Sequence, residues 1–101
     1  MAIHIGACRI KLRLPENDNL KGKRHVVKSV IARVRDRFNV SIAEVDDNDV
    51  WQLITLGIGC VSNDSRHANE VLSKVVSYIE SIGNDSDAEF LDYEIEIIPV
   101  L

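Results

Sequence analysis

The chain has 101 residues, a formal net charge of −4, an apolar fraction of 46% and two cysteines. This length accommodates one domain with a single hydrophobic core, and the apolar fraction excludes a disordered chain. Two cysteines are too few for a disulfide-framed secreted module, and no apolar run approaches the roughly 20 residues of a membrane span. The first positive charge, Arg9, follows the apolar residues of the N-terminus, which is not the order of a signal peptide. We therefore expect one cytoplasmic domain over residues 1–101.

Residues 3–14 are predicted to form a strand, because apolar residues alternate along them. The alternation changes phase near Gly6–Cys8, which predicts a β-bulge there. Pro15 ends the strand, and Asn19 is predicted to cap a helix over residues 20–38. Its predicted buried stripe consists of Leu20, Val27, Ile31, Val34 and Phe38.

The remaining elements follow from the same patterns of apolar spacing and turn residues. They are a strand over 40–46, a hairpin loop at 46–49, a strand over 51–61, a helix over 65–82 and a last strand over 91–97. Gly83 follows the second helix and is predicted to take the left-handed conformation.

The resulting order, βαββαβ, predicts an α+β fold of the ferredoxin-like, split βαβ type. Right-handed crossovers place both helices on one face of a four-stranded antiparallel sheet. The first strand then lies between the third and the last. On the open face, a basic row of Arg9, Lys11 and Arg13 is expected to border and neutralise an acidic row of Asp92, Glu94 and Glu96.

No catalytic or metal-binding pattern emerges from the sequence. The three histidines lie on different predicted elements, and neither cysteine belongs to a Cys-x-x-Cys pair. The run Asp46-Asp47-Asn48-Asp49 lacks the glycine and glutamate of a calcium loop, so we interpret it as a turn. No nucleophile is grouped with a His and an acid, and no Gly-rich phosphate loop occurs. Cys8 and Cys60 are expected to be reduced core thiols. We expect no enzyme and no cofactor, and no small-molecule substrate is identified.

Positive charge is concentrated in the first third of the chain, which carries +7 up to Arg37, against −11 for the rest. On the predicted first helix, four basic residues share one flank within about 60°, whereas Lys23 lies on the other flank with Arg33 and Arg37. Basic residues this close together repel one another, which predicts an anionic partner such as RNA or a ribosomal particle. The alternative is that they form only a solvated helix face, which carries as many basic residues without binding a partner. The candidate contacts are Lys21, Lys23, Arg24, Lys28 and Arg35.

The open sheet face offers an alternative function. It lacks the aromatic residues on the central strands with which RRM proteins stack bases. Glycines on the third strand permit close approach of another backbone. The alternative is therefore a homo-oligomeric structural or regulatory domain, such as a homodimer, that buries this face or binds a ligand there. Its candidate interface residues are Trp51, Leu53, Thr55 and Gly57.

Glu44 poses a question of register. If Ile42 points inward, Glu44 does so too, and its carboxylate needs a cation such as Lys23 or Arg24 from the first helix. In the other register, Ala43 and Val45 point inward and Glu44 stays in water. We prefer the paired arrangement because Ile42 is the better core residue.

The run from Leu20 to Ser29, Leu-Lys-Gly-Lys-Arg-His-Val-Val-Lys-Ser, resembles the YlxP-like family of small bacterial proteins. The resemblance continues through residues 37–45, Trp51, Leu56-Gly57, residues 61–64 and residues 91–95. Gly22 departs from the polar residue expected there. The resemblance implies a ferredoxin-like fold and supplies no catalytic residues. Family members are often encoded beside translation initiation factor two and ribosome-binding factor A, which implies work on RNA or ribosomes. We therefore predict a non-enzymatic RNA- or ribosome-associated binding module.

Overall fold

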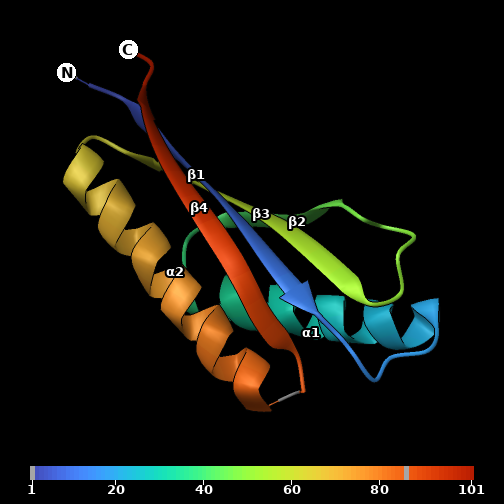
Figure 1. Cartoon of the computed structure of the whole chain (residues 1–101). Coiled ribbons are helices and arrows are strands. Elements are labelled where there is room, and N and C mark those ends of the chain that lie inside the picture. Colours follow the sequence, from blue (N-terminus) through green and yellow to red (C-terminus); the bar gives the residue numbers. More distant parts are fainter. Residues whose placement is uncertain (1, 86) are drawn as a thin grey trace.

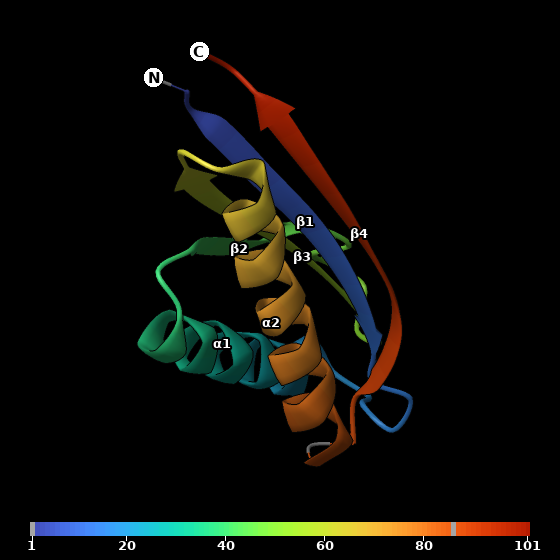
Figure 2. The ribbon, with the colours of Figure 1, turned by 90° about the vertical axis from the view of Figure 1, so that its left-hand side faces the viewer.

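The computed structural model describes residues 2–85 and 87–101, the side chain of Asp85 excepted. Its four strands form one antiparallel sheet in the order β2-β3-β1-β4. Both helices cover the same face of this sheet, as the two views in Figure 1 and Figure 2 show. The elements are β1 (His4–Arg13), α1 (Leu20–Arg37), β2 (Ser41–Asp46), β3 (Leu53–Ser62), α2 (Ser65–Asp85) and β4 (Glu89–Pro99). The fold is therefore the predicted ferredoxin-like α+β arrangement.

The core lies between the helices and the covered face of the sheet. The even-numbered residues of β1 and β3 point into it, as the alternation predicts, and Ile10, Leu12 and Leu56 are fully buried. From α2 the core receives Leu72, Val75 and Ile79, which are also fully buried. Each such side chain contributes about 1.5–3 kcal/mol of hydrophobic stabilisation. No helix in the described part of the chain is long and apolar enough to cross a membrane.

The start of α1 is fixed by two asparagines. Asn19 caps the helix as predicted, since its Oδ1 accepts a hydrogen bond from the Gly22 amide at 2.7 Å. Asn17 Nδ2 donates to the Trp51 carbonyl oxygen at 2.7 Å and so ties this turn to the β2–β3 connection. A Cβ at position 22 would collide with Asn17 Oδ1. Gly22 therefore permits the close approach of Asn17.

The predicted bulge near Gly6–Cys8 is wrong. The β1–β3 register runs unbroken from His4 to Arg13. The apolar phase changes because Ile5 belongs to the open face. Register shifts occur instead in the edge strands, where Leu91 of β4 and Val45 of β2 are the extra residues.

The predicted end of the second helix is also corrected. α2 continues to Asp85, and Gly83 does not have a positive φ. The left-handed conformation falls on Asp87, with φ of 59°. The amide of Ala88 donates to the Gly83 carbonyl oxygen at 3.1 Å, and the left-handed residue lies four positions later than predicted.

Both cysteines are free and lie on the core side of adjacent strands. Burial raises the pKa of the Cys8 thiol to about 11. Burial also raises the pKa of Cys60, although a hydrogen bond with the Gly6 backbone opposes this effect. Because the thiolate is the nucleophile, both thiols are poorly reactive at neutral pH.

Candidate functional site

The exposed face of α1 carries a row of basic side chains that have no acidic partner. Lys21, Arg24 and Lys28 are exposed and form no ion pair or hydrogen bond within residues 2–85 and 87–101. Arg35 is also exposed, and its Nη2 donates to the Ile42 carbonyl oxygen at 3.3 Å. We call these four residues the α1 flank. At 1.5 Å per residue, the row from Lys21 to Arg35 extends about 20 Å along the helix.

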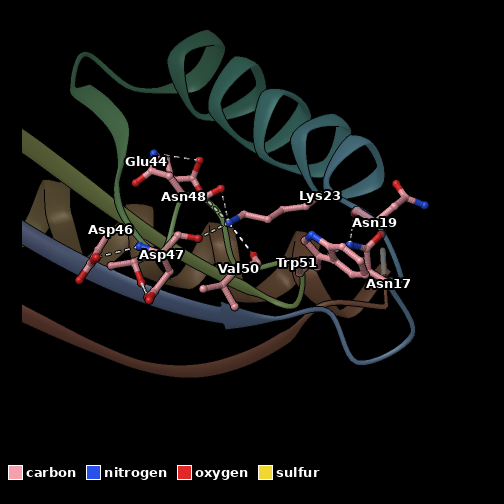
Figure 3. Close-up of polar contacts among 10 residues, drawn as sticks. Asn17, Asn19, Lys23, Glu44, Asp46, Asp47, Asn48, Val50 and Trp51 are labelled. Carbon is pink, nitrogen blue, oxygen red and sulfur yellow. Dashed lines mark hydrogen bonds and ion pairs between the residues drawn. The ribbon is translucent and has the colours of Figure 1, made fainter.

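Lys23 does not belong to this surface, which corrects the prediction that it contacts phosphate. Its side chain is fully buried. It extends from α1 to the β2–β3 loop, where Nζ donates to the carbonyl oxygens of Asp47, Asn48 at 3.2 Å and Val50 at 2.8 Å (Figure 3). Lys23 is thus an internal clamp on this loop.

The reason for the error is the orientation of α1. The buried residues of the helix are Lys23, Val27, Val30 and Val34. This stripe is rotated by about 40° from the predicted one. The predicted stripe contained Ile31, which is only half-buried, and omitted the buried Val30, so its centre fell away from Lys23.

Glu44 is paired with Lys23, as the inward register predicts. It is on the same side of β2 as the buried Ile42, and its side chain is 16% exposed. Glu44 Oε2 lies 2.9 Å from Lys23 Nζ. The same ammonium group also donates to the three loop carbonyls, so it serves both the loop and the Glu44 carboxylate.

The acidic loop is a turn, and its polar groups are used internally. Asp47 has a φ of 57°, and its Oδ2 accepts a hydrogen bond from Thr55 Oγ1 at 2.7 Å. The Asp47 amide donates to Asp46 Oδ1 at 2.8 Å. Among the residues that the structure describes, no three His, Cys, Asp or Glu side chains group together as metal ligands would.

Two of the predicted interface residues are covered by the chain itself. Thr55 is 1% exposed, because the loop folds against it. Val45 of the β2 bulge lies over Gly57, where a Cβ would come within 2.7 Å of Val45 Cγ1. Leu53 is half-buried, and Trp51 remains exposed in the loop. The close approach that Gly57 allows is therefore intramolecular.

Two of the three cations in the basic row of the sheet are paired with acidic residues, in contrast to the α1 flank. Arg9 Nη2 lies 3.5 Å from Glu94 Oε1, and Arg13 Nη2 lies 3.0 Å from Glu89 Oε2. Lys11 is opposite Asp92 in the register. Exposed pairs of this kind contribute about 0–1 kcal/mol each. The predicted neutralisation is confirmed for Arg9 by Glu94, whereas Arg13 pairs with Glu89 from outside the predicted row. Lys11 and Glu96 form no ion pair among the residues that the structure describes.

Comparisons with known proteins identify the family. The family described as "Protein of unknown function (DUF503)" matches residues 5–95. The chain is 35% identical over 77 residues to the "Uncharacterized protein YlxP" of Bacillus subtilis (strain 168), an alignment that covers 76% of this chain and 84% of that protein.

Solved structures share the fold at low sequence identity. A C-terminal segment of the alpha subunit of aIF2 from Pyrococcus abyssi superposes with a TM-score of 0.58 at 11% identity, and AtUAH in complex with (S)-hydroxyglycine with a TM-score of 0.58 at 12% identity. Each alignment covers 98% of this chain, which spans 51% of the first structure and 29% of the second. These likenesses concern the fold alone. The family match and the bacterial relative together establish that this chain belongs to the DUF503 family of YlxP-like proteins.

Proposed function

We propose that this chain is a cytoplasmic, non-enzymatic binding module that associates with RNA or a ribosomal particle through the α1 flank. The observation that carries the proposal is the difference between the two basic surfaces. On the sheet, Arg9 and Arg13 form ion pairs and Lys11 lies opposite Asp92 in the register, whereas Lys21, Arg24 and Lys28 have no partner in the described part of the chain. Unmatched, exposed cations in a row repel one another, and an RNA phosphate backbone relieves that repulsion.

The experiment is a titration of a structured ribosomal RNA fragment at 50–200 mM salt, followed by fluorescence anisotropy. Four phosphate contacts give a slope of log K against log salt of about −4, which is a loss of affinity of about 100-fold over this range. Changing Lys21→Glu together with Arg24→Glu removes two contacts and is expected to reduce the slope by about 2.

The matched control is Arg9→Glu with Arg13→Glu, which changes the net charge equally but on the open sheet face. We expect this variant to keep the salt slope of the unmodified chain. Equal losses in both variants would reveal a response to net charge alone. A binding constant independent of salt would refute the phosphate contacts.

A homodimer through the open sheet face is a second candidate, favoured by an exposed apolar row at one end of that face. Val61, 71% exposed, and Ile98, 42% exposed, both pair with Ile5 and flank it. If this row is the interface, Val61→Glu should convert a dimer into a monomer in size-exclusion chromatography with light scattering. A chain that is already monomeric, or a dimer that survives Val61→Glu, would rule this interface out.

A further inference from the structure

A hollow of about 330 Å³ lies between the C-terminal end of α1, the end of β3 and the first turns of α2. Its wall includes the apolar side chains of Phe38, Ala68 and Val71. Three basic side chains also line it, those of Arg37, His67 and Lys74, and no acidic side chain is among the described residues of the wall. An apolar wall with convergent basic groups is the composition of a site for an organic anion.

The charge of Arg37 is available to a ligand. Its guanidinium carbon lies 4.5 Å from the centroid of the Tyr78 ring, and within the described residues it forms no ion pair. Tyr78 is itself fixed by an edge-on contact with Phe38, with centroids 5.8 Å apart. A cation held over an aromatic ring keeps its charge, whereas one held by a carboxylate is neutralised.

A second hollow, of about 420 Å³, adjoins the first. It shares Arg37, Phe38 and Lys74 with the first and adds Ser73, Ser77 and Tyr78. Because Arg37 and Lys74 line both, the two cations stand where the hollows meet. The serine hydroxyls are additional donors for oxygen atoms of an anion.

We propose that this cleft binds a nucleotide, with the base in the first hollow against Phe38 and Val71 and the phosphate between Arg37 and Lys74. The volume suits a ligand of this size, since small-molecule sites measure about 300–1,000 Å³. The proposal goes beyond the α1 flank and does not depend on it, because Arg37 faces Tyr78 of α2. A free nucleotide and the terminal nucleotide of an RNA carry the same chemistry.

Calorimetric titration with adenosine 5′-monophosphate tests the site, with adenosine and inorganic phosphate as separate probes. We expect the nucleotide to bind at least tenfold more tightly than either adenosine or inorganic phosphate.

Arg37→Ala with Lys74→Ala should weaken nucleotide binding at least tenfold. Lys21→Ala with Arg24→Ala, an equal change of charge on the α1 flank, should leave it unchanged. Lys74→Glu alone is the second variant, because its exposed side chain can be changed without loss of the fold, which circular dichroism verifies.

A short RNA with a 5′-phosphate, compared with the same RNA bearing a 5′-hydroxyl, separates the two sources of ligand. A preference for the 5′-phosphate that Lys74→Glu abolishes supports the site as a reader of RNA ends. Binding of the free nucleotide that Lys74→Glu abolishes supports it as a nucleotide site. The proposal is overturned if neither adenosine 5′-monophosphate nor the RNA with a 5′-phosphate binds at millimolar concentration. It is also overturned if their binding survives both Lys74→Glu and the Arg37–Lys74 double variant. Loss of RNA binding in the α1 flank variants with retained nucleotide binding would separate the two proposals.

Discussion

Replacing Lys23 with methionine is expected to lower the free energy of unfolding by about 3–5 kcal/mol, the cost of removing one partner of a buried ion pair. Methionine keeps most of the volume of the fully buried side chain but not its charge. Glu44 would then be a largely buried carboxylate without a cation. The carbonyl oxygens of Asp47, Asn48 and Val50 would lose their shared donor, so the β2–β3 loop should also loosen.

Urea unfolding followed by circular dichroism measures the global effect, and the fluorescence of Trp51, the only tryptophan, reports on the loop. Lys28→Met is the matched control, since Lys28 lies on the same helix, is exposed and has no partner among the described residues. It should change stability by no more than about 0.5 kcal/mol. Glu44→Gln should cost less than Lys23→Met, because the ammonium keeps its three carbonyls. Equal stabilities of Lys23→Met and Lys28→Met would show that the clamp contributes nothing.

Apolar periodicity was sufficient to predict the fold. The even-numbered residues of β3 and the stripe of α2 are unambiguous, and the right-handed crossover then leaves one topology for a βαββαβ order. The bulges were not predictable in the same way. A change of apolar phase is produced equally by an extra residue or by apolar residues on both faces, and β1 has the second arrangement.

The site was predictable only in part, because the residue type alone does not show whether a charged side chain is exposed to solvent or buried. Lys23 has the same chemistry as Lys21, and only its angular position near Val27 and Val30 distinguishes it. The inward position of Glu44 was the signal that a buried cation was required. The Arg37–Lys74 cleft joins residues 37 positions apart, and its cations come from two different helices. Periodicity within one element holds no information on such a juxtaposition.

Truncating Leu72 to alanine is expected to lower the free energy of unfolding by about 2–5 kcal/mol. The side chain is fully buried where α2 packs on β1, so the truncation loses apolar burial and leaves a cavity in the middle of the core. Val71→Ala, on the half-buried neighbouring position, should cost less. A Leu72→Ala variant as stable as Val71→Ala would mean that α2 does not anchor the core at this point.

The cavity left by Leu72→Ala should reduce the destabilisation caused by a methyl group at position 6. In the native core, a Cβ on Gly6 would lie 2.8 Å from Leu72 Cδ1 and 2.9 Å from Cys60 Sγ, which is closer than packed atoms tolerate. Gly6→Ala alone is therefore expected to destabilise the fold by about 1–3 kcal/mol through overpacking. In the Leu72→Ala background the first of these collisions is gone, and the new methyl group occupies part of the cavity. The contact with Cys60 Sγ remains, so we expect Gly6→Ala to be less destabilising there, with a favourable coupling of about 0.5–3 kcal/mol in the double-mutant cycle from urea unfolding. Additive losses in the double variant would contradict a direct contact between β1 and α2 at Gly6.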